Sequence, residues 1–241
     1  MKITPDTIVG EVVKMNFKTA SLFQASNIDY CCGGRITISE ACAGVGIDSN
    51  MLITNLDAML SQTDPDASYI NSLNLAELTS YIVKRHHTYV RESIPFIEKS
   101  LEKLCQVHGN KHPELFKISE LFNNSAGELT KHMQKEEIVL FPYINKLVLA
   151  QENGTQPSEP RFGTVSNPIG AMMAEHQAEG ERFDEISKLS NNYQVPGDAC
   201  ITYKVTFDRL NDYENDLHRH IHIENNILFP RAILLEKDLL S

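Results

Sequence analysis

One pattern of ligand-type residues occurs twice in this chain of 241 residues, and the two copies lie 88 positions apart. Each copy reads H-x-x-x-E-x-x-x-L-F-P. Positions i and i+4 share one face of a helix, so each copy offers an imidazole and a carboxylate one turn apart: His132 with Glu136, and His220 with Glu224. A buried carboxylate is costly unless it is paired or bound to a metal. Two such helices packed face to face therefore favour a metal centre.

A further histidine precedes each copy at almost the same distance. His87 stands 45 residues before His132, and His176 stands 44 residues before His220. Each half of the repeat thus predicts a helical hairpin. Four imidazoles and two carboxylates suit two metal ions, each with two imidazoles, bridged by the carboxylates and open to oxygen, nitric oxide or water. A ligand set without thiols favours iron or manganese over copper(I) or a structural tetra-thiolate zinc.

Other histidines compete for these roles. His86 adjoins His87 but points about 100° away around the helix, and the matched spacing of the two halves favours His87. His218 and His222 share a face about 200° from His220. They form an alternative pair, against which the repeat alignment selects His220. The L-F-P tails are interpreted as packing residues and a helix-end signal.

Carboxylates near the predicted ligands form a second set of candidates. Glu128 precedes His132 by four positions and Asp216 precedes His220 by four, which predicts that both lie on the ligand face. Glu175, next to the third-helix histidine, is another candidate. Each could accept the second ring N–H of a ligand histidine or relay protons, and the alternative for each is a solvated surface carboxylate. Glu137 adjoins a predicted ligand but is off register.

Adjacent thiols mark the N-terminal part of the chain. Cys31 and Cys32 are followed by Gly33 and Gly34, which give a flexible backbone. Adjacent cysteines form an internal disulfide only with strain, so redox exchange, metal transfer and persulfide chemistry are the functional interpretations. The alternative is a pair of part-buried structural cysteines. Five cysteines, an odd number, do not resemble a secreted disulfide framework, and we expect a reducing cytoplasm.

The elements that must position these residues are all helical. Residues 1–60 predict a small helical domain, and residues 61–73 read as a linker because they hold a Thr-Asp-Pro-Asp turn signal. Residues 74–241 predict four amphipathic helices, the first with a capping box at Asn74 and Glu77. Their connections suggest an all-α chain with an up-down-up-down four-helix bundle.

Composition excludes several classes of partner. A net charge of −10 argues against nucleic acid or an anionic membrane surface. No apolar run reaches the ~20 residues of a membrane span, and the first residues lack the apolar core of a signal peptide. We therefore expect a cytoplasmic protein.

Taken together, these motifs resemble the RIC (repair of iron centres) family of ScdA/YtfE-type iron–sulfur cluster repair di-iron proteins. The run from Ile28 to Gly34 is similar to the ScdA N-terminal domain, and the histidine motifs, together with Arg91 and Pro95, are similar to a hemerythrin-like bundle. His86 departs from the pattern because an aromatic residue is common there. The resemblance implies a non-haem di-iron centre with oxo and carboxylate bridges, whose iron ligands match His87, His132, Glu136, His176, His220 and Glu224.

The same resemblance implies a function and its partners. It implies repair of iron–sulfur clusters damaged by nitric oxide or peroxide, with apo or damaged iron–sulfur proteins as partners and a homodimer as one option. Iron donation, with Cys31 and Cys32 as the handover point, is the first hypothesis. A di-iron nitric oxide reductase and a sensor that binds oxygen or nitric oxide are the alternatives. Only the resemblance ranks donation first.

Overall fold

A computed structural model describes residues 2–241, and every regular element in that range is helical. The chain is divided into two compact structural units. We call residues 80–143 and 166–220 the bundle unit, and residues 1–79, 144–165 and 221–241 the terminal unit. Within residues 2–241 there is no β-strand, and the one extended pairing is an isolated bridge between Ile8 and Thr37. The predicted all-α class is confirmed.

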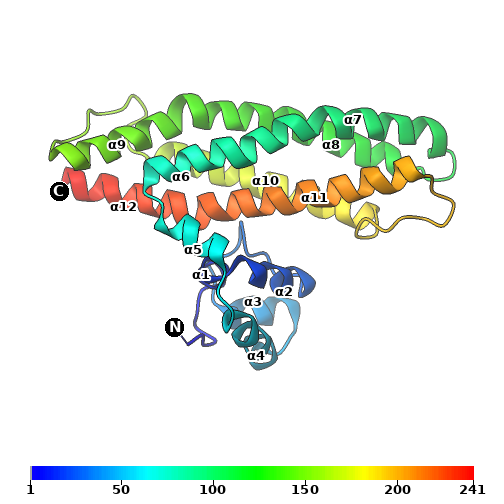
Figure 1. Cartoon of the computed structure of the whole chain (residues 1–241), viewed down its shortest axis with the longest axis horizontal. Coiled ribbons are helices and arrows are strands. Elements are labelled where there is room, and N and C mark those ends of the chain that lie inside the picture. The colour runs from blue at the N-terminus through cyan, green and yellow to red at the C-terminus, as the bar shows by residue number, and fades with distance from the viewer. Residues whose placement is uncertain (1) are drawn as a thin grey trace. The chain divides into compact units, whose positions relative to one another are not determined.

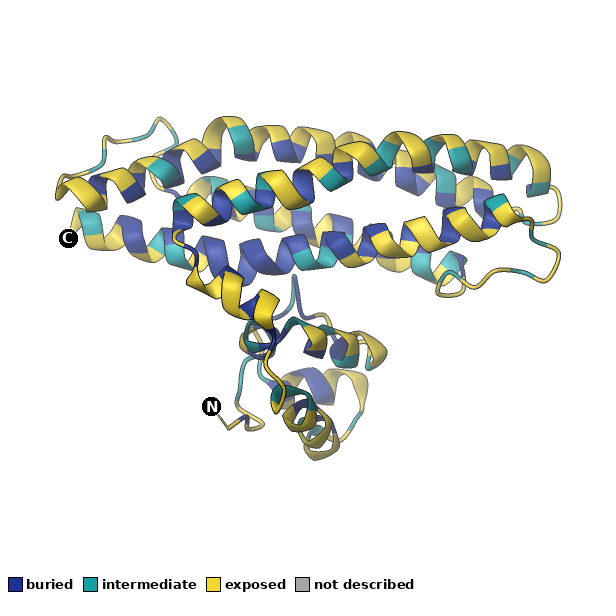
Figure 2. Cartoon of the chain, viewed as in Figure 1, coloured by how far each residue is buried: buried dark blue, intermediate teal, exposed yellow. Residues whose placement is uncertain are grey.

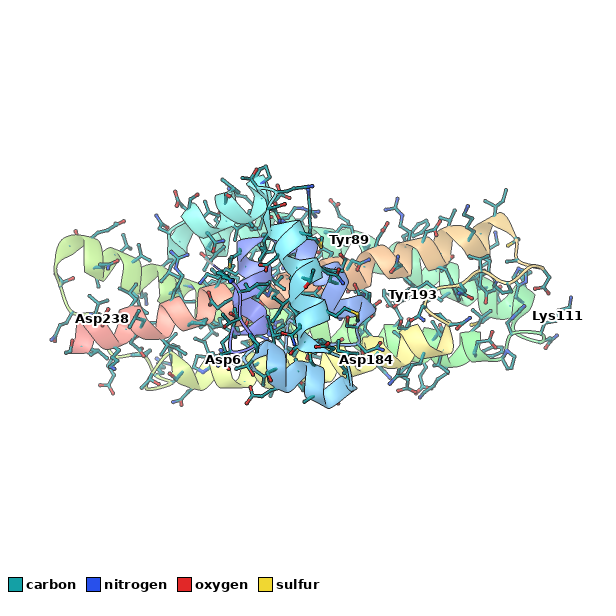
Figure 3. The ribbon with its side chains drawn as sticks, turned by 90° about the horizontal axis from the view of Figure 1, so that it is seen from below. Asp6, Tyr89, Lys111, Asp184, Tyr193 and Asp238 are labelled. Carbon is teal, nitrogen blue, oxygen red and sulfur yellow. The ribbon has the colours of Figure 1, made fainter. Side chains whose placement is uncertain are left out.

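The bundle unit consists of long helices that run alongside one another (Figure 1). They are α7 (Thr88–His108), α8 (Glu114–Lys135), α10 (Ser166–Leu189) and the part of α11 (Ile201–Ile223) that lies in this unit. Lys111, in the turn between α7 and α8, lies at one end of the unit (Figure 3).

Side-chain pairs give the direction of each helix. Just before α7, His86 pairs with Asp216 of α11, and at the far end of α7, His108 contacts Tyr203 of α11. On α8 and α10, His132 meets His176 while Ser125 meets Glu179. Residue numbers rise on one helix as they fall on the next, so neighbours are antiparallel. The predicted up-down-up-down bundle is therefore confirmed.

Aromatic side chains fill the bundle unit away from the histidines. Tyr213 of α11 lies with its ring centroid 5.3 Å from that of Phe122 and 5.6 Å from that of Phe183. Tyr203 and Phe207 pack about three and two turns earlier on α11, with ring centroids 4.6 Å apart. All five rings are almost fully buried, and the buried stripe is visible along each helix in Figure 2. This core fixes the helix faces that carry the histidines.

Three wide π-helical turns interrupt the long helices beside the predicted ligands. They are η2 (Val83–His87), η3 (Glu136–Leu140) and η4 (Glu224–Leu228). The N–H of Phe141 donates to the carbonyl of Glu136, and the N–H of Phe229 donates to that of Glu224, five residues back in each case. Proline follows each phenylalanine and has no N–H for an ordinary helical bond. Turns of this kind are frequent at functional sites.

The leucine and phenylalanine of each L-F-P tail are buried, as the packing interpretation expects, but the tails do not end the helices, so the helix-end interpretation was wrong. The chain continues as α9 (Phe141–Asn153) after the first tail and as α12 (Phe229–Leu240) after the second. Proline is tolerated in the first turn of a helix, where its missing N–H would have no partner anyway. The tails instead mark where a π-helical turn returns to an α-helix.

The terminal unit begins with short helices. They are α1 (Val9–Met15), η1 (Phe17–Thr19), α2 (Ala20–Ala25), α3 (Ile38–Val45), α4 (Ser49–Leu60) and α5 (Pro65–Ser72). Helix α5 lies in the stretch that composition suggests is a linker, because Asp64 caps it and Pro65 occupies its first turn. Helix α6 (Leu75–Ile82) begins at the predicted capping box, with Asn74 and Glu77 joined by two reciprocal bonds of 2.8 Å.

Within residues 2–241, none of the helices combines the length and apolar character that a membrane span requires.

Candidate metal centre

Glu136 lies between two histidines in the interior of the bundle unit. Its Oε2 is 3.3 Å from Nε2 of His87, and its Oε1 is 3.4 Å from Nε2 of His132. Glu136 and His87 are fully buried and His132 nearly so. Because each oxygen faces a different imidazole, this carboxylate has the arrangement of a bridging ligand.

Two more buried histidines complete the set of imidazoles. Nε2 of His176 is 3.1 Å from Nε2 of His132, and the ring of His220 lies with its centroid 5.1 Å from that of His87. Two imidazole nitrogens at 3.1 Å repel unless a proton or another cation lies between them. The arrangement therefore suits an N–H···N hydrogen bond or a metal ion shared by the two rings.

Two overlapping groups of side chains could hold metal ions. One group is His87, Glu136, His220 and Glu224, and the other is His132, Glu136, His176 and Glu224; in each, the ligand atoms lie within 4.8 Å of one another. Glu224 follows His220 by one turn, where α11 continues into η4. All six residues are buried. Each group offers two imidazoles and shares both carboxylates, so the donor set fits a pair of cations of the iron, manganese or zinc type.

Carboxylates outside the centre hold two of the imidazoles in orientation. Nδ1 of His87 is 2.6 Å from Oε1 of Glu137, which also accepts from Arg91 at 2.6 Å. Burial raises the pKa of Glu137, but the bonds from His87 and Arg91 lower it on balance. A carboxylate at Nδ1 fixes the tautomer of the ring and keeps Nε2 directed at the centre.

The second outer carboxylate is Glu175. Its Oε2 is 2.8 Å from Nδ1 of His132, and Lys135 pairs with its other oxygen. The hydrogen bond from His132, helped by Lys135, lowers the pKa of Glu175 to about 2. His87 and His132 thus have the same arrangement, in which a basic residue holds a carboxylate that orients the histidine.

The other predicted outer carboxylates lie elsewhere. Glu128 is largely exposed and pairs with Lys131 at 2.9 Å, so the structure does not bring it to His132. Asp216 accepts from Nδ1 of His86 at 3.0 Å rather than from His220. Sequence reasoning missed Glu137. The signal that could have revealed it is Arg91, a basic residue one turn after His87.

The alternative histidines have other partners. His86 is buried and stacks on His220, with ring centroids 5.3 Å apart and planes inclined by 6°. Burial lowers the pKa of His86, which favours the neutral ring despite Asp216. His222 is also buried, and its Nδ1 lies 3.1 Å from Nδ2 of Asn226. Neither residue belongs to the two groups of potential ligands.

The adjacent thiols lie in a tight loop of the terminal unit. Oδ1 of Asp29 accepts from the N–H groups of Cys31 and Cys32 at 2.9 Å each, and Oδ2 accepts from Gly33 at 2.7 Å. The two sulfur atoms are 3.8 Å apart. The hydrogen bond to Cys32 and burial raise the pKa of Cys31 well above its ordinary value, so its thiol stays protonated. Asp29 and both thiols are also close enough together to hold a metal ion.

Comparison with known proteins agrees with this geometry. Residues 78–232 match the hemerythrin HHE cation binding domain, and residues 5–60 match the ScdA_N domain, described as a domain of unknown function. The chain is 35% identical over 217 residues to the iron-sulfur cluster repair protein YtfE of Yersinia pseudotuberculosis serotype O:1b (strain IP 31758). It has the same identity to the protein of that name from Yersinia pestis (strain Pestoides F). Each alignment covers 90% of this chain and 91% of the relative.

Proposed function

This chain belongs to the family of the iron–sulfur cluster repair protein YtfE, and on that premise we propose that it restores iron–sulfur clusters damaged by nitric oxide or peroxide. The cations of its centre are two non-haem iron ions bridged by carboxylates and an oxo group. Their ligands are His87, His132, Glu136, His176, His220 and Glu224. The observation that carries the proposal is the position of Glu136, whose two oxygens face the imidazoles of His87 and His132.

The donor set supports iron donation as the mode of repair. Imidazole and carboxylate donors suit iron, whereas clusters hold iron through thiolates and sulfide. An ion that leaves a nitrogen and oxygen site for a sulfur site moves to softer donors, which bind ferrous iron well. The repair role implies iron–sulfur proteins as targets, and apo or nitrosylated proteins are the proposed recipients.

The adjacent thiols are the proposed handover point. Cys32 is more exposed than Cys31, and both lie with Asp29 in a group that could hold one metal ion. A protonated Cys31 must lose its proton to bind iron, so binding releases a proton as the ion arrives. This requirement weakens the affinity of the thiols for iron at neutral pH, which suits a transient handover.

An isotope experiment tests donation. The chain is loaded with ⁵⁷Fe without oxygen and mixed with a [4Fe–4S] dehydratase that nitric oxide has inactivated. We expect the dehydratase to regain activity and to contain ⁵⁷Fe. Cys31→Ser and Cys32→Ser should keep the iron of the donor but slow its transfer, while Cys105→Ser on α7 serves as the matched control.

Other outcomes separate the alternatives. Recovery of the dehydratase without ⁵⁷Fe would refute donation. Sustained consumption of nitric oxide with an electron donor, while all iron remains bound, would favour a nitric oxide reductase. Reversible binding of nitric oxide or oxygen with neither turnover nor iron loss would favour a sensor.

A further inference from the structure

Two adjacent asparagines of the terminal unit bind the backbone of the cysteine loop, which we define as residues 30–34. Asn225 and Asn226 directly follow Glu224 in η4. Nδ2 of Asn225 donates to the carbonyl of Cys31 at 3.3 Å. Nδ2 of Asn226 shares its two hydrogens among Nδ1 of His222 at 3.1 Å and the carbonyls of Cys31 and Tyr30 at 3.3 and 3.4 Å. We infer that Asn225 and Asn226 are positioning residues that hold the cysteine loop against the turn that carries Glu224. We call this set of side-chain contacts to the loop the lock.

Residues near the cysteine loop also contact the region around Asn225, which supports the lock. The guanidinium of Arg35 donates to the backbone carbonyl of Asn225 at 3.1 Å. The rings of Phe17 and Tyr30 flank His222, with centroids 5.8 and 6.1 Å from that of the imidazole. Backbone carbonyls and a guanidinium therefore contact this turn, and two aromatic rings contact the end of α11 directly before it, so the loop has one defined position there.

Gly10 of α1 also lies against Asn226. A Cβ atom added to Gly10 would lie 2.8 Å from Oδ1 of Asn226 and 3.1 Å from the carbonyl of Gly34. The N–H of Gly10 donates to that same carbonyl at 2.7 Å. Helix α1 can approach this closely only because the residue has no side chain. Asn226 therefore lies between α1 and the cysteine loop, in contact with both.

The lock controls how readily Cys31 is reached. Cys31 is only 4% exposed as a residue, so we expect a reagent or a metal ion to reach its sulfur when the loop lifts from the turn. Asn226→Asp keeps the shape of the side chain but replaces its donor by an acceptor that faces two carbonyls. Loss of such bonds shifts a local opening equilibrium by roughly tenfold or more. The use of this control in iron handover rests on the proposed function.

Alkylation resolved by peptide mass spectrometry tests the inference on the iron-loaded full chain. We expect iodoacetamide to modify Cys31 about tenfold faster in Asn226→Asp, and faster also in Asn225→Asp, than in the unaltered protein. Asn215→Asp is the matched control, because it adds the same charge on the exposed surface of α11, where Nδ2 of Asn215 donates to Oδ1 of Asn211 at 3.3 Å. It should leave the Cys31 rate unchanged.

A substitution in the small helices gives a second test of the lock. Gly10→Ala should displace Asn226 and raise the Cys31 rate, whereas Gly44→Ala, whose new Cβ would meet no atom within 4 Å, should not. Cys42, buried in α3, reports on unfolding of the small helices. Unchanged Cys31 rates in Asn226→Asp and Gly10→Ala would overturn the inference. So would a Cys42 rate that rises in step with Cys31, since that pattern indicates general unfolding.

The same variants separate this inference from the proposed function. If Asn226→Asp speeds alkylation of Cys31 and also changes the rate of ⁵⁷Fe transfer, the lock acts in handover. If alkylation speeds up and transfer stays the same, the lock stands and the handover role of the thiols is wrong.

Discussion

Replacing Glu137 by glutamine should weaken the binding of one metal ion and leave the binding of the other unchanged. Glu137 contacts His87 but not His132, and the two histidines belong to different groups of ligands. Glutamine keeps the size of the side chain and removes the charge that holds Nδ1 of His87. The imidazole then loses its fixed tautomer and is a weaker ligand.

The magnitude follows from the bond that is lost. A separation of 2.6 Å between Nδ1 of His87 and Oε1 of Glu137 is that of a charge-assisted hydrogen bond. Such bonds contribute about 1.5–3 kcal/mol, which corresponds to roughly 10- to 150-fold in the affinity for one ion. Losses of an outer carboxylate in other metal sites, about 10- to 100-fold, have the same size.

Competition with a ferrous chelator under anaerobic conditions measures this effect. The unaltered chain should release its two ions at similar chelator concentrations, and Glu137→Gln should release the first ion at a concentration at least tenfold lower. Glu128→Gln is the matched control, because Glu128 is exposed and bonds Lys131. Release curves of Glu137→Gln that coincide with those of the control would refute the orienting role.

Three further changes have defined outcomes. Glu175→Gln should weaken the binding of the ion in the His132 group and leave the other ion bound, so the same chelator titration should again show early release of one ion. Glu136→Ala should lose both ions and the stabilisation that they give, because both groups share this carboxylate; iron analysis with thermal melting would show this, and unchanged iron content would contradict the assignment. Burial raises the pKa of Glu214 from 4.5 to about 7, so the folded chain holds this proton more tightly than the unfolded chain and loses stability as pH rises from about 4.5 through 7. Glu214→Gln should therefore stabilise the fold by about 3 kcal/mol at pH 8 and by almost nothing at pH 4, as denaturant unfolding at the two pH values would reveal.

The ligand helices could be predicted because their signals are local. His132 and Glu136 share a helix face through a spacing of four, and the repeat of that spacing at His220 identifies its partner helix. The matched upstream histidines then select His87 and His176. Periodicity and duplication therefore indicate both the bundle and its potential ligands.

The outer carboxylates could not be predicted in the same way. Helical spacing suggests that Glu128 lies with His132, yet its side chain turns to Lys131 in solvent. Glu137 reaches His87 because a π-helical turn begins at Glu136 and changes the register of the residues that follow. That turn depends on a proline whose effect on the helix path is decided by packing.

Contacts between residues far apart in the sequence could not be predicted from sequence patterns either. Asn226 and Cys31 are 195 residues apart, and no spacing rule relates them. The lone glycine at position 10 likewise has meaning only once Asn226 lies against it. Such contacts form from the packing of whole elements, which local propensities do not specify.

Iron stoichiometry with Mössbauer spectroscopy, on protein purified without oxygen, tests the central claim most directly. The account predicts two iron ions per chain in coordination of nitrogen and oxygen type, both lost in Glu136→Ala. One iron ion or none per chain, or two ions that Glu136→Ala retains, would contradict a dinuclear centre built around this carboxylate.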